Sequence, residues 1–362
     1  VLSTAAVMTM VTSIAAPAFA DAYGIALYGT HYLDQGNITV EVRGGQYYVN
    51  DVLDDDGPVI IKNHEDESDT TSVSNTITIH AEDGEANVTL KDVDIVTNGE
   101  ANKSGITVKA DKTKTATATV NVTLDNVTVD AREDASSEGA TGGAGMTIQG
   151  NGVVNIELDG KNELLAGDGH AGLEKNRTES VGSLNINDSN EDGGSLTAIG
   201  GDGGAGIGGG KGDMGSGLYI LNGTVNAYGK GGGAGIGGGD GAGAHMVGLN
   251  AGVPGVNDAY EPTATAVGSE GAAGIGGGKG GRLTDAVLSS GTLTGTMETL
   301  EYLQAHGAQT IVFTTSQRTS SFQISDLLAL ADEGDVFYLT HTEANEPTLL
   351  VVTSDHTDLL EG

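Results

Sequence analysis

The chain alternates apolar and polar residues over many short runs. In residues 87–95, valine, leucine and isoleucine alternate with asparagine, threonine and aspartate, and residues 120–130 repeat this order almost position by position. Alternate side chains of a β-strand point to opposite faces, so each run predicts strand with one buried face. Both runs change phase at an Asp-Val or Asp-Asn-Val step, which predicts a corner between two strands.

A glycine-rich phrase recurs among these strands. The phrase Ala-Gly-Ile-Gly-Gly-Gly places its isoleucine at Ile207, Ile236 and Ile275, and looser copies centre on Ile106, Met146 and Leu173. From Ile106 onward the steps are 40, 27, 34, 29 and 39 residues. Repeats of roughly 20 to 50 residues are typical of solenoids, in which each unit buries its apolar face against the next.

One repeat can be assembled from its strands. The phrase around Ile207 supplies a first strand, residues 218–220 a second and residues 224–227 a third. At about 3.3 Å per residue, three such strands and their turns close a triangular coil, and stacked coils pair in parallel about 4.8 Å apart. Ile207, Ile236 and Ile275 would then lie one above another in the interior. We therefore predict an all-β fold, a parallel β-helix; helix is excluded because Gly costs about 1 kcal/mol relative to Ala.

The regions outside the repeat have other patterns. Residues 1–20 are interpreted as a truncated secretory signal ending in Ala18-Phe19-Ala20, and we expect export and no membrane span. We predict an N-terminal cap over 21–75, the β-helix over 76–300 and a C-terminal cap or small α+β module over 301–362, with a short helix at 325–334. The segment 242–266 breaks the period and is interpreted as a side loop, either a ligand contact or a tolerated insertion.

The charge balance narrows the range of partners. There are 50 acidic and 16 basic residues, and the formal net charge is −34. Such a surface repels nucleic acid phosphates and anionic lipid, whereas it suits calcium, whose ligands are carboxylate and carbonyl oxygens. The alternative is an acidic surface that serves only solubility. Cysteine is absent, so disulfides, thiolate metal sites and thiol nucleophiles are excluded.

Four aspartates beside the repeated phrase are candidate calcium ligands. Asp168, Asp202 and Asp240 stand in Gly-Asp-Gly turns, and Asp213 follows Gly-Lys-Gly. A turn offers free carbonyl oxygens next to the carboxylate, which is the ligand chemistry that calcium takes. These aspartates fit neither a calcium roll nor an EF-hand loop, and the alternative is that each caps the backbone of its own turn.

Three tyrosines are candidate platforms for a sugar. Sugar sites use aromatic side chains, but Trp is absent from this chain. Tyrosine has an apolar body and a polar tip that suit a sugar face, and the candidates in the repeat region are Tyr219, Tyr228 and Tyr260. Tyr219 alternates with Leu218 and Ile220 and is therefore expected to point outward. The alternative for each tyrosine is packing over a glycine corner.

The phrase Gly-Ala-Gly-Ile-Gly-Gly-Gly, followed by a Gly-Thr-Val-x-Ala strand, resembles secreted bacterial proteins, mostly of anaerobic Firmicutes, that are described as carbohydrate-binding-domain-containing. The resemblance covers roughly residues 36–300 and is closest over 205–241. It implies a right-handed parallel β-helix on the cell surface, with binding of plant-wall polysaccharide and calcium in some relatives. It assigns no ligand residue.

We predict a secreted or cell-surface adhesion protein that binds extracellular polysaccharide, with calcium as a possible aid. The first alternative is a structural surface or matrix protein whose units associate end to end. The second is a calcium-dependent polysaccharide lyase, which needs carboxylates that hold calcium and a nearby base. Of the arginines, Arg132, Arg177 and Arg282 fall in the repeat, and nothing marks one of them as a base. We therefore expect no enzyme.

Overall fold

The computed structural model describes residues 29–55, 58–113, 116–132, 142–190, 192–249 and 263–280, six later strands, and Ser325 and Leu328. Nearly all of the regular structure in these residues is β-strand, with a short 3-10 helix, η1 (Leu33–Gln35). The predicted signal over 1–20, Tyr260 and Arg282 lie outside the described residues. The all-β prediction is confirmed.

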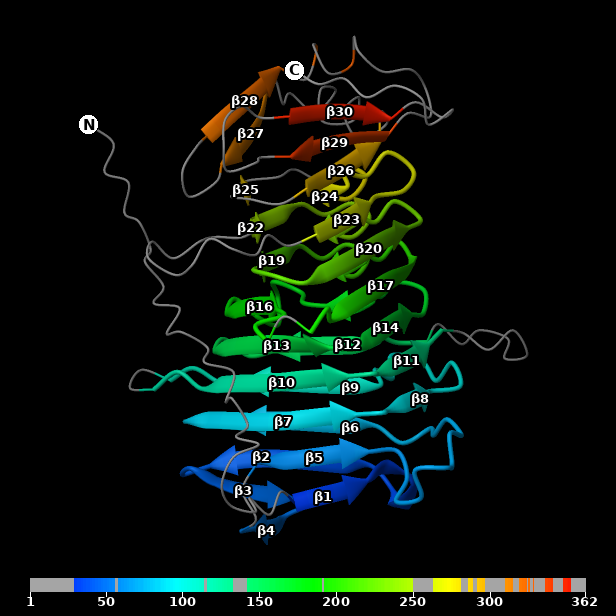
Figure 1. Cartoon of the computed structure of the whole chain (residues 1–362), viewed down its shortest axis with the longest axis vertical. Helices are drawn as coiled ribbons and strands as arrows, with labels where there is room; N and C mark the ends of the chain where they lie inside the picture. Colours follow the sequence, from blue (N-terminus) through cyan, green and yellow to red (C-terminus); the bar gives the residue numbers. More distant parts are fainter. Residues whose placement is uncertain are drawn as a thin grey trace.

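The described strands form three sheets, whose strands follow one another along the long axis of the molecule (Figure 1). The eleven-stranded sheet contains, in spatial order, β1 (Gly29–Tyr32), β5 (Val59–Lys62), β7 (Glu85–Lys91), β10 (Thr119–Asp125), β13 (Val153–Asp159), β16 (Ser183–Asn187), β19 (Gly215–Ile220), β22 (Ala244–Leu249), β25 (Ala286–Leu288), β27 (Thr310–Thr314) and β28 (Thr319–Gln323). The nine-stranded sheet contains β30 (Thr348–Val352), β29 (Val336–Thr340), β26 (Thr292–Thr296), β23 (Thr263–Val267), β20 (Thr224–Lys230), β17 (Ser195–Asp202), β14 (Lys161–Ala166), β11 (Thr128–Ala131) and β8 (Asp94–Val96). The ten-stranded sheet contains β24 (Ile275–Gly276), β21 (Ile236–Gly237), β18 (Ile207–Gly208), β15 (Leu173–Glu174), β12 (Met146–Gln149), β9 (Ile106–Ala110), β6 (Ile77–Ala81), β2 (Ile38–Arg43), β3 (Gln46–Val49) and β4 (Val52–Asp54).

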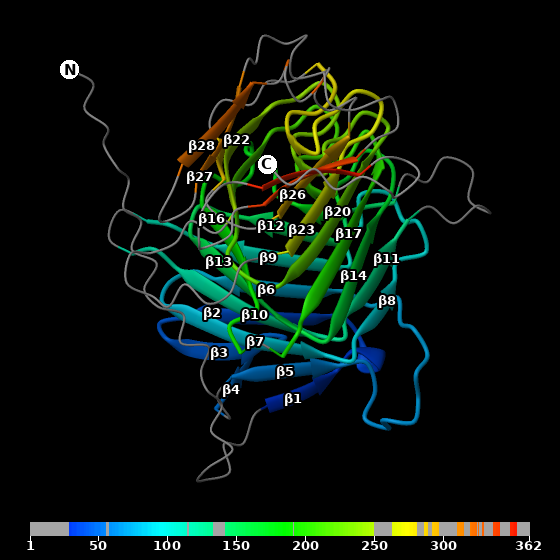
Figure 2. The same cartoon turned by 45° about the horizontal axis from the view of Figure 1, so that its top comes forward.

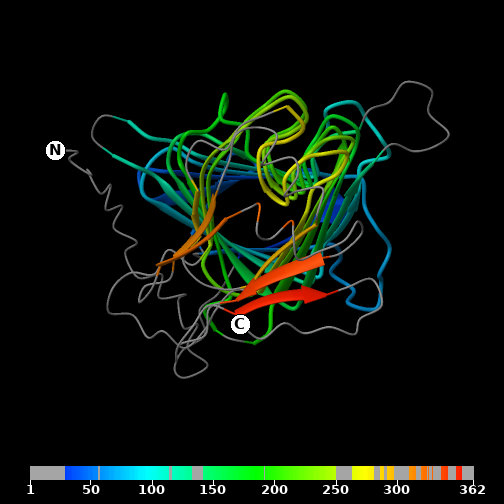
Figure 3. The ribbon, with the colours of Figure 1, turned by 90° about the horizontal axis from the view of Figure 1, so that it is seen from above.

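From β6 to β26 the chain visits the three sheets in a fixed rotation. Three consecutive strands, which we call a unit, enter the ten-, eleven- and nine-stranded sheets in that order, and each strand from β6 to β23 pairs in parallel with the third strand after it. One unit is β18, β19 and β20, the three strands that the sequence around Ile207 predicts. Seen from above, successive units lie over one another (Figure 3).

The repeated phrase builds a column of buried side chains in the ten-stranded sheet. Ile207 pairs with Ile236, which pairs with Ile275, and the three residues are 1%, 0% and 8% exposed. The predicted stacking of these isoleucines is therefore confirmed. The looser copies join the same column, which runs through Ile77, Ile106, Met146 and Leu173. With inward residues of the other two sheets, it forms one hydrophobic core.

The phase changes in the sequence are corners, as predicted. Asp92 and Asn126 have φ of 51° and 57°, and Gly160 at the equivalent corner has φ of 63°. Aspartate, asparagine and glycine are the residues that tolerate this left-handed conformation best. One backbone step of this kind redirects the chain from the eleven-stranded to the nine-stranded sheet.

The interpretation of 242–266 as a side loop is wrong at its two ends. Residues 244–249 form β22, which pairs in parallel with β19, and residues 263–267 form β23, which pairs with β20. Ala244, His245 and Gly248 obscure the alternation of apolar and polar residues in β22, so its sequence alone favours strand only weakly. Pairing with β19 stabilises the strand. Residues 250–262 lie outside the described part of the chain.

Both ends of the stack carry antiparallel strands. At the N-terminal end, β2, β3 and β4 form an antiparallel meander, with Gly44 and Gly45 at the predicted turn. At the C-terminal end, β27 pairs with β28, and β29 lies between β26 and β30, all antiparallel. Ser325 and Leu328, the described residues of the predicted 325–334 helix, have helical conformation, and Leu328 packs against the core. The domain boundaries at 75 and 300 remain predictions.

Candidate functional site

The outer face of the nine-stranded sheet carries a column of apolar side chains. Strands β26 to β8 of this sheet lie side by side in Figure 2. Leu165 pairs with Ile199, Ile199 with Tyr228 and Tyr228 with Val267, and all four alternate with inward core residues. Leu165 is buried and the other three are partly exposed. We call these four residues the outer apolar column.

A polar column runs beside it, two residues earlier on each strand. It consists of Glu163, Thr197, Asn226 and Thr265, in the same register. The side chains of Thr197, Asn226 and Thr265 are partly exposed and make no hydrogen bond to other described residues. Their hydroxyl and amide groups are therefore available to an external ligand.

Together the two columns form a surface with the chemistry of a sugar site. Saccharides present C–H faces that pack on apolar or aromatic side chains, and hydroxyl groups that exchange hydrogen bonds with polar side chains. Neighbouring strands are about 4.8 Å apart, so both kinds of contact recur at that interval along the stack. This arrangement favours an extended ligand lying across the strands.

The structure separates two of the three predicted tyrosines, Tyr219 and Tyr228. Tyr228 belongs to the outer apolar column, whereas Tyr219 lies on β19 of the eleven-stranded sheet, paired with Asn185 and Gly248. Tyr219 is half-buried, and burial raises the pKa of its hydroxyl. Since Tyr260 lies outside the described residues, Tyr219 and Tyr228 are the two that can be compared, and they stand on different sheets.

A ladder of asparagines precedes Tyr219 on the eleven-stranded sheet. Asn121 donates from Nδ2 to Oδ1 of Asn87 at 2.8 Å, Asn155 donates to Asn121 at 2.7 Å, and Asn185 donates to Asn155 at 2.7 Å. Asn155 and Asn185 are only 8% and 7% exposed. The ladder therefore stabilises strand register more than it offers a ligand surface. The sequence signal was the asparagine at matching positions 87 and 121.

The four candidate calcium aspartates lie in successive units, with Asp168, Asp213 and Asp240 in the connections between strands and Asp202, predicted in a turn, at the end of β17. The carboxylate of Asp168 accepts a hydrogen bond from the Asp202 N–H at 3.1 Å, so these two residues are adjacent. Asp240 donates its N–H to the Gly203 carbonyl at 2.8 Å, and the carboxylate of Asp213 accepts the Thr178 hydroxyl at 2.9 Å. No three His, Asp or Glu side chains are grouped to hold a metal within the described residues. Calcium binding at these four residues remains a prediction.

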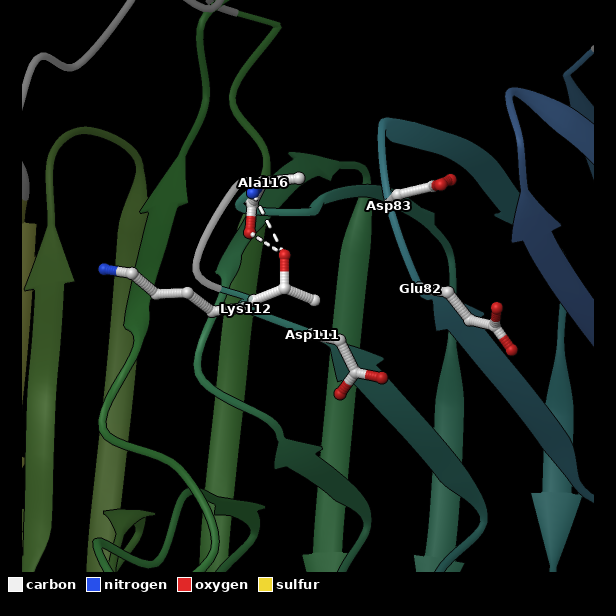
Figure 4. A pocket seen from close by; sticks show the side chains of 6 residues that line it. Glu82, Asp83, Asp111, Lys112 and Ala116 are labelled. Atoms are coloured by element: carbon white, nitrogen blue, oxygen red, sulfur yellow. Dashed lines mark hydrogen bonds between the residues drawn. The ribbon is translucent and has the colours of Figure 1, made fainter.

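An open pocket of about 540 Å³ lies where β6 and β9 end, lined by Glu82, Asp83, Asp111, Lys112, Thr113 and Ala116 (Figure 4). Asp111 Oδ2 lies 2.8 Å from His80 Nε2 and accepts a hydrogen bond from Lys109 Nζ at 3.2 Å. Burial raises the pKa of Asp111, but these two hydrogen bonds outweigh it and hold the pKa below its usual value. Lys112 extends away from the carboxylates (Figure 4), so the pocket does not bring an acid and a free base together.

Sequence reasoning missed a buried polar cluster around the end of β15. Glu174, Lys175 and Asn176 stand where the phrase elsewhere has Gly208, Gly209 and Gly210. Glu174 Oε2 lies 3.0 Å from His170 Nδ1 and accepts the Ala171 N–H at 3.0 Å, while its Oε1 accepts from Asn176 Nδ2 at 3.1 Å. The hydrogen bond with Glu174 raises the pKa of His170.

Lys175 is the unusual member of this cluster, because it is fully buried and has no carboxylate partner in the described part of the chain. Its ammonium donates to the carbonyls of Ser216 at 2.6 Å and Ser180 at 3.3 Å. Burial lowers its pKa to about 8. The sequence signal for this cluster was the presence of three charged or polar residues where the other copies of the phrase have glycine. The cluster joins neighbouring units and is closed to a large ligand.

No protein-family model, curated protein or solved structure matches this chain. Among the described residues, no helix is long and apolar enough to cross a membrane. The outer columns of the nine-stranded sheet are therefore the strongest candidate site.

Proposed function

We propose that the three sheets wind into a right-handed parallel β-helix, and that the protein is secreted or displayed at the cell surface, where it binds an extended polysaccharide. The ligand lies along the outer face of the nine-stranded sheet. The observation that carries this proposal is the register of Ile199, Tyr228 and Val267 beside Thr197, Asn226 and Thr265.

The repetition of weak contacts supplies the affinity in this proposal. A sugar packed on one partly exposed aromatic or aliphatic side chain gains little by itself, but several registered contacts on one rigid face act on the same chain. The net charge of −34 disfavours nucleic acid and anionic lipid on this face. It favours a neutral glycan, or an acidic glycan bridged by cations.

Two observations weigh against the alternative functions. The ten-stranded sheet finishes in antiparallel strands at the N-terminal end and the other two sheets finish in antiparallel strands at the C-terminal end, so the two ends of the stack do not present matching parallel edges to each other. The pocket beside Asp111 holds carboxylates, but its lining lysine, Lys112, extends away from them (Figure 4), and the neighbouring His80 and Lys109 are both bound to Asp111. A binding protein therefore agrees with the geometry better than a matrix subunit or a lyase.

The proposal predicts that Tyr228→Ala weakens glycan binding roughly tenfold, since an aromatic contact contributes about 0.5–1.5 kcal/mol and 1.4 kcal/mol is tenfold. An array of cell-wall polysaccharides identifies the strongest ligand, and calorimetry then compares the wild type with Tyr228→Ala. Tyr219→Ala is the matched control, because Tyr219 is also a half-buried outward tyrosine but lies on another sheet.

Equal affinity of the wild type and Tyr228→Ala, or an equal loss in both variants, would overturn the assignment of the face. A wild-type protein that binds no glycan on the array would overturn the function itself. Release of unsaturated sugars from pectin would show a lyase instead. Far-ultraviolet circular dichroism confirms that each variant is folded.

A further inference from the structure

The corner between β16 and β17 is longer than the equivalent corners of the three preceding units and contains a buried carboxylate. In the three preceding units this corner is formed around Asp92, Asn126 and Gly160, whereas here residues 188–194 separate the two strands. Asp188 directly follows the registered pair Glu157–Asn187, at the position that core leucines occupy in the preceding units. Asp188 is only 5% exposed.

The sequence of this corner matches the first half of a calcium-loop pattern. Residues 188–193 read Asp-Ser-Asn-Glu-Asp-Gly, which matches the pattern Asp-x-Asn-x-Asp-Gly. In such loops the first, third and fifth side chains supply oxygen ligands and the glycine makes a sharp turn. Gly193 has φ of 89°, as that turn requires. The second half of an EF-hand loop is absent, since Ile199 stands at its twelfth position.

An unsatisfied oxygen lies under this loop. Oδ1 of Asp188 is buried and has no hydrogen-bond partner among the described residues. The N–H groups of Asp192, Gly193 and Gly194 face the same carboxyl group, which places it inside the loop. A buried acceptor without a partner costs about 1–3 kcal/mol, and more when it is charged. A bound cation would satisfy it.

Further oxygens surround Asp188. Asn190 donates from Nδ2 to Asp159 Oδ1 at 2.9 Å, and Asn190 Oδ1 accepts the Asp192 N–H at 3.3 Å. Burial raises the pKa of both Asp188 and Asp159, and the neighbouring negative charges, including that of Asp192, raise it further. The N–H groups of the loop lower the pKa of Asp188 in part, but among the described residues no cationic side chain pairs with Asp188, Asp192 or Asp159, so the loop concentrates negative charge.

The neighbouring units hold the loop in position from both sides. Glu157 Oε1 accepts the Ser189 N–H at 2.6 Å, the Ser189 hydroxyl at 2.9 Å and the Asn190 N–H at 3.3 Å. On the other side, Asn222 Nδ2 donates to the Asp188 carbonyl at 2.8 Å. Contacts that fix the backbone reduce the ordering cost when a ligand binds.

We propose that this loop binds one calcium ion through side-chain oxygens of Asp188, Asn190 and Asp192, with Asp159 as a further carboxylate. Calcium accepts amide and carbonyl oxygens as well as carboxylates, so the site does not depend on a preformed trio of acidic side chains. Its irregular coordination also suits a loop better than the strict octahedron of magnesium. This site is distinct from the candidate aspartates Asp202 and Asp240.

The proposal is tested by titrating calcium chloride into the full chain after treatment with EDTA. We expect the loop to bind one ion with a Kd between about 10⁻⁵ and 10⁻³ M, the range of sensor and extracellular calcium modules. Asp188→Asn should abolish it, and Asp192→Asn should weaken it at least tenfold. The control is the double variant Asp51→Asn/Asp55→Asn, which changes two exposed carboxylates outside the loop and outside the four candidate calcium aspartates, and should bind as the wild type does.

A stability measurement separates lost binding from lost folding. In EDTA, Asp188→Asn should unfold at a temperature equal to or above that of the wild type, because the variant buries no unpaired charge. Added calcium should raise the unfolding temperature of the wild type and of the double variant but not of Asp188→Asn. Absence of calcium binding by the wild type up to 10 mM, or loss of binding in the double variant with retention in Asp188→Asn, would overturn the site. No glycan enters either measurement, so failure here leaves the polysaccharide proposal standing.

Discussion

Replacing Gly208 by alanine is expected to destabilise the protein by more than about 4 kcal/mol, because two penalties coincide at this residue. Gly208 has φ of 132°, which side chains with a Cβ rarely adopt. A Cβ at this position would also lie 2.0 Å from the carbonyl oxygen of Gly237 in the next unit. The neighbouring atom is backbone in a paired strand, so it cannot move without disturbing the stack.

Two control variants separate these penalties, and urea unfolding measures the free energy of unfolding of Gly208→Ala and of both controls. Gly212→Ala keeps a positive φ of 79° but meets nothing within 4 Å, so it should cost only about 1–2 kcal/mol. Gly204 lies outside the left-handed region, but its Cβ would stand 1.8 Å from the His170 carbonyl oxygen, so Gly204→Ala isolates the close approach. If Gly208→Ala and Gly212→Ala cost the same, the close packing of units described here is wrong.

The buried Lys175 should make stability rise with pH in alkaline solution. Its pKa is about 8 in the folded chain against 10.5 in the unfolded chain, so the unfolded state binds more protons between these values. The free energy of unfolding therefore increases from pH 8 to pH 10.5, by up to about 3 kcal/mol at 1.36 kcal/mol per pKa unit. Below pH 8 the penalty of burying the charged ammonium is present in full.

This prediction is read as a difference between variants, since other groups also titrate at high pH. Urea unfolding of the wild type and of Lys175→Met at intervals from pH 7 to pH 10.5 should give curves that diverge, with the extra rise in the wild type alone. Lys211→Met is the control, because Lys211 is exposed in a turn of the following unit. Parallel curves for the wild type and Lys175→Met would show that the ammonium is not buried as described.

Much of the fold could be predicted because its sequence signals are local. The alternation of apolar and polar residues predicts the strands, and its phase changes predict the corners at Asp92 and Asn126. The glycine phrase predicts the buried column through Ile207. The strand β22 was missed because its residues alternate weakly, and its pairing with β19 is a tertiary effect. The handedness of the winding has no local signal in this chain.

The candidate site was less accessible to sequence reasoning. Tyr228 was identified by residue type, but the outer apolar column depends on Leu165, Ile199 and Val267 being in register with it. These partners are 34, 29 and 39 residues apart, so no fixed period reveals them. The loop at Asp188 was overlooked for a similar reason. Half of a calcium loop is a weak pattern until an unpartnered oxygen is found beneath it.

The number of residues between paired strands differs from unit to unit, and this shows where the chain tolerates insertions. Differences in unit length are taken up at the corners, while Ile207, Ile236 and Ile275 keep their pairing. A corner can therefore acquire extra residues, as between β16 and β17, without moving either the core or the outer columns. Duplicating a whole unit would lengthen the proposed ligand track by one strand spacing, about 4.8 Å. The number of units therefore sets the length of the proposed binding face, while the corners can vary in sequence and length without changing it.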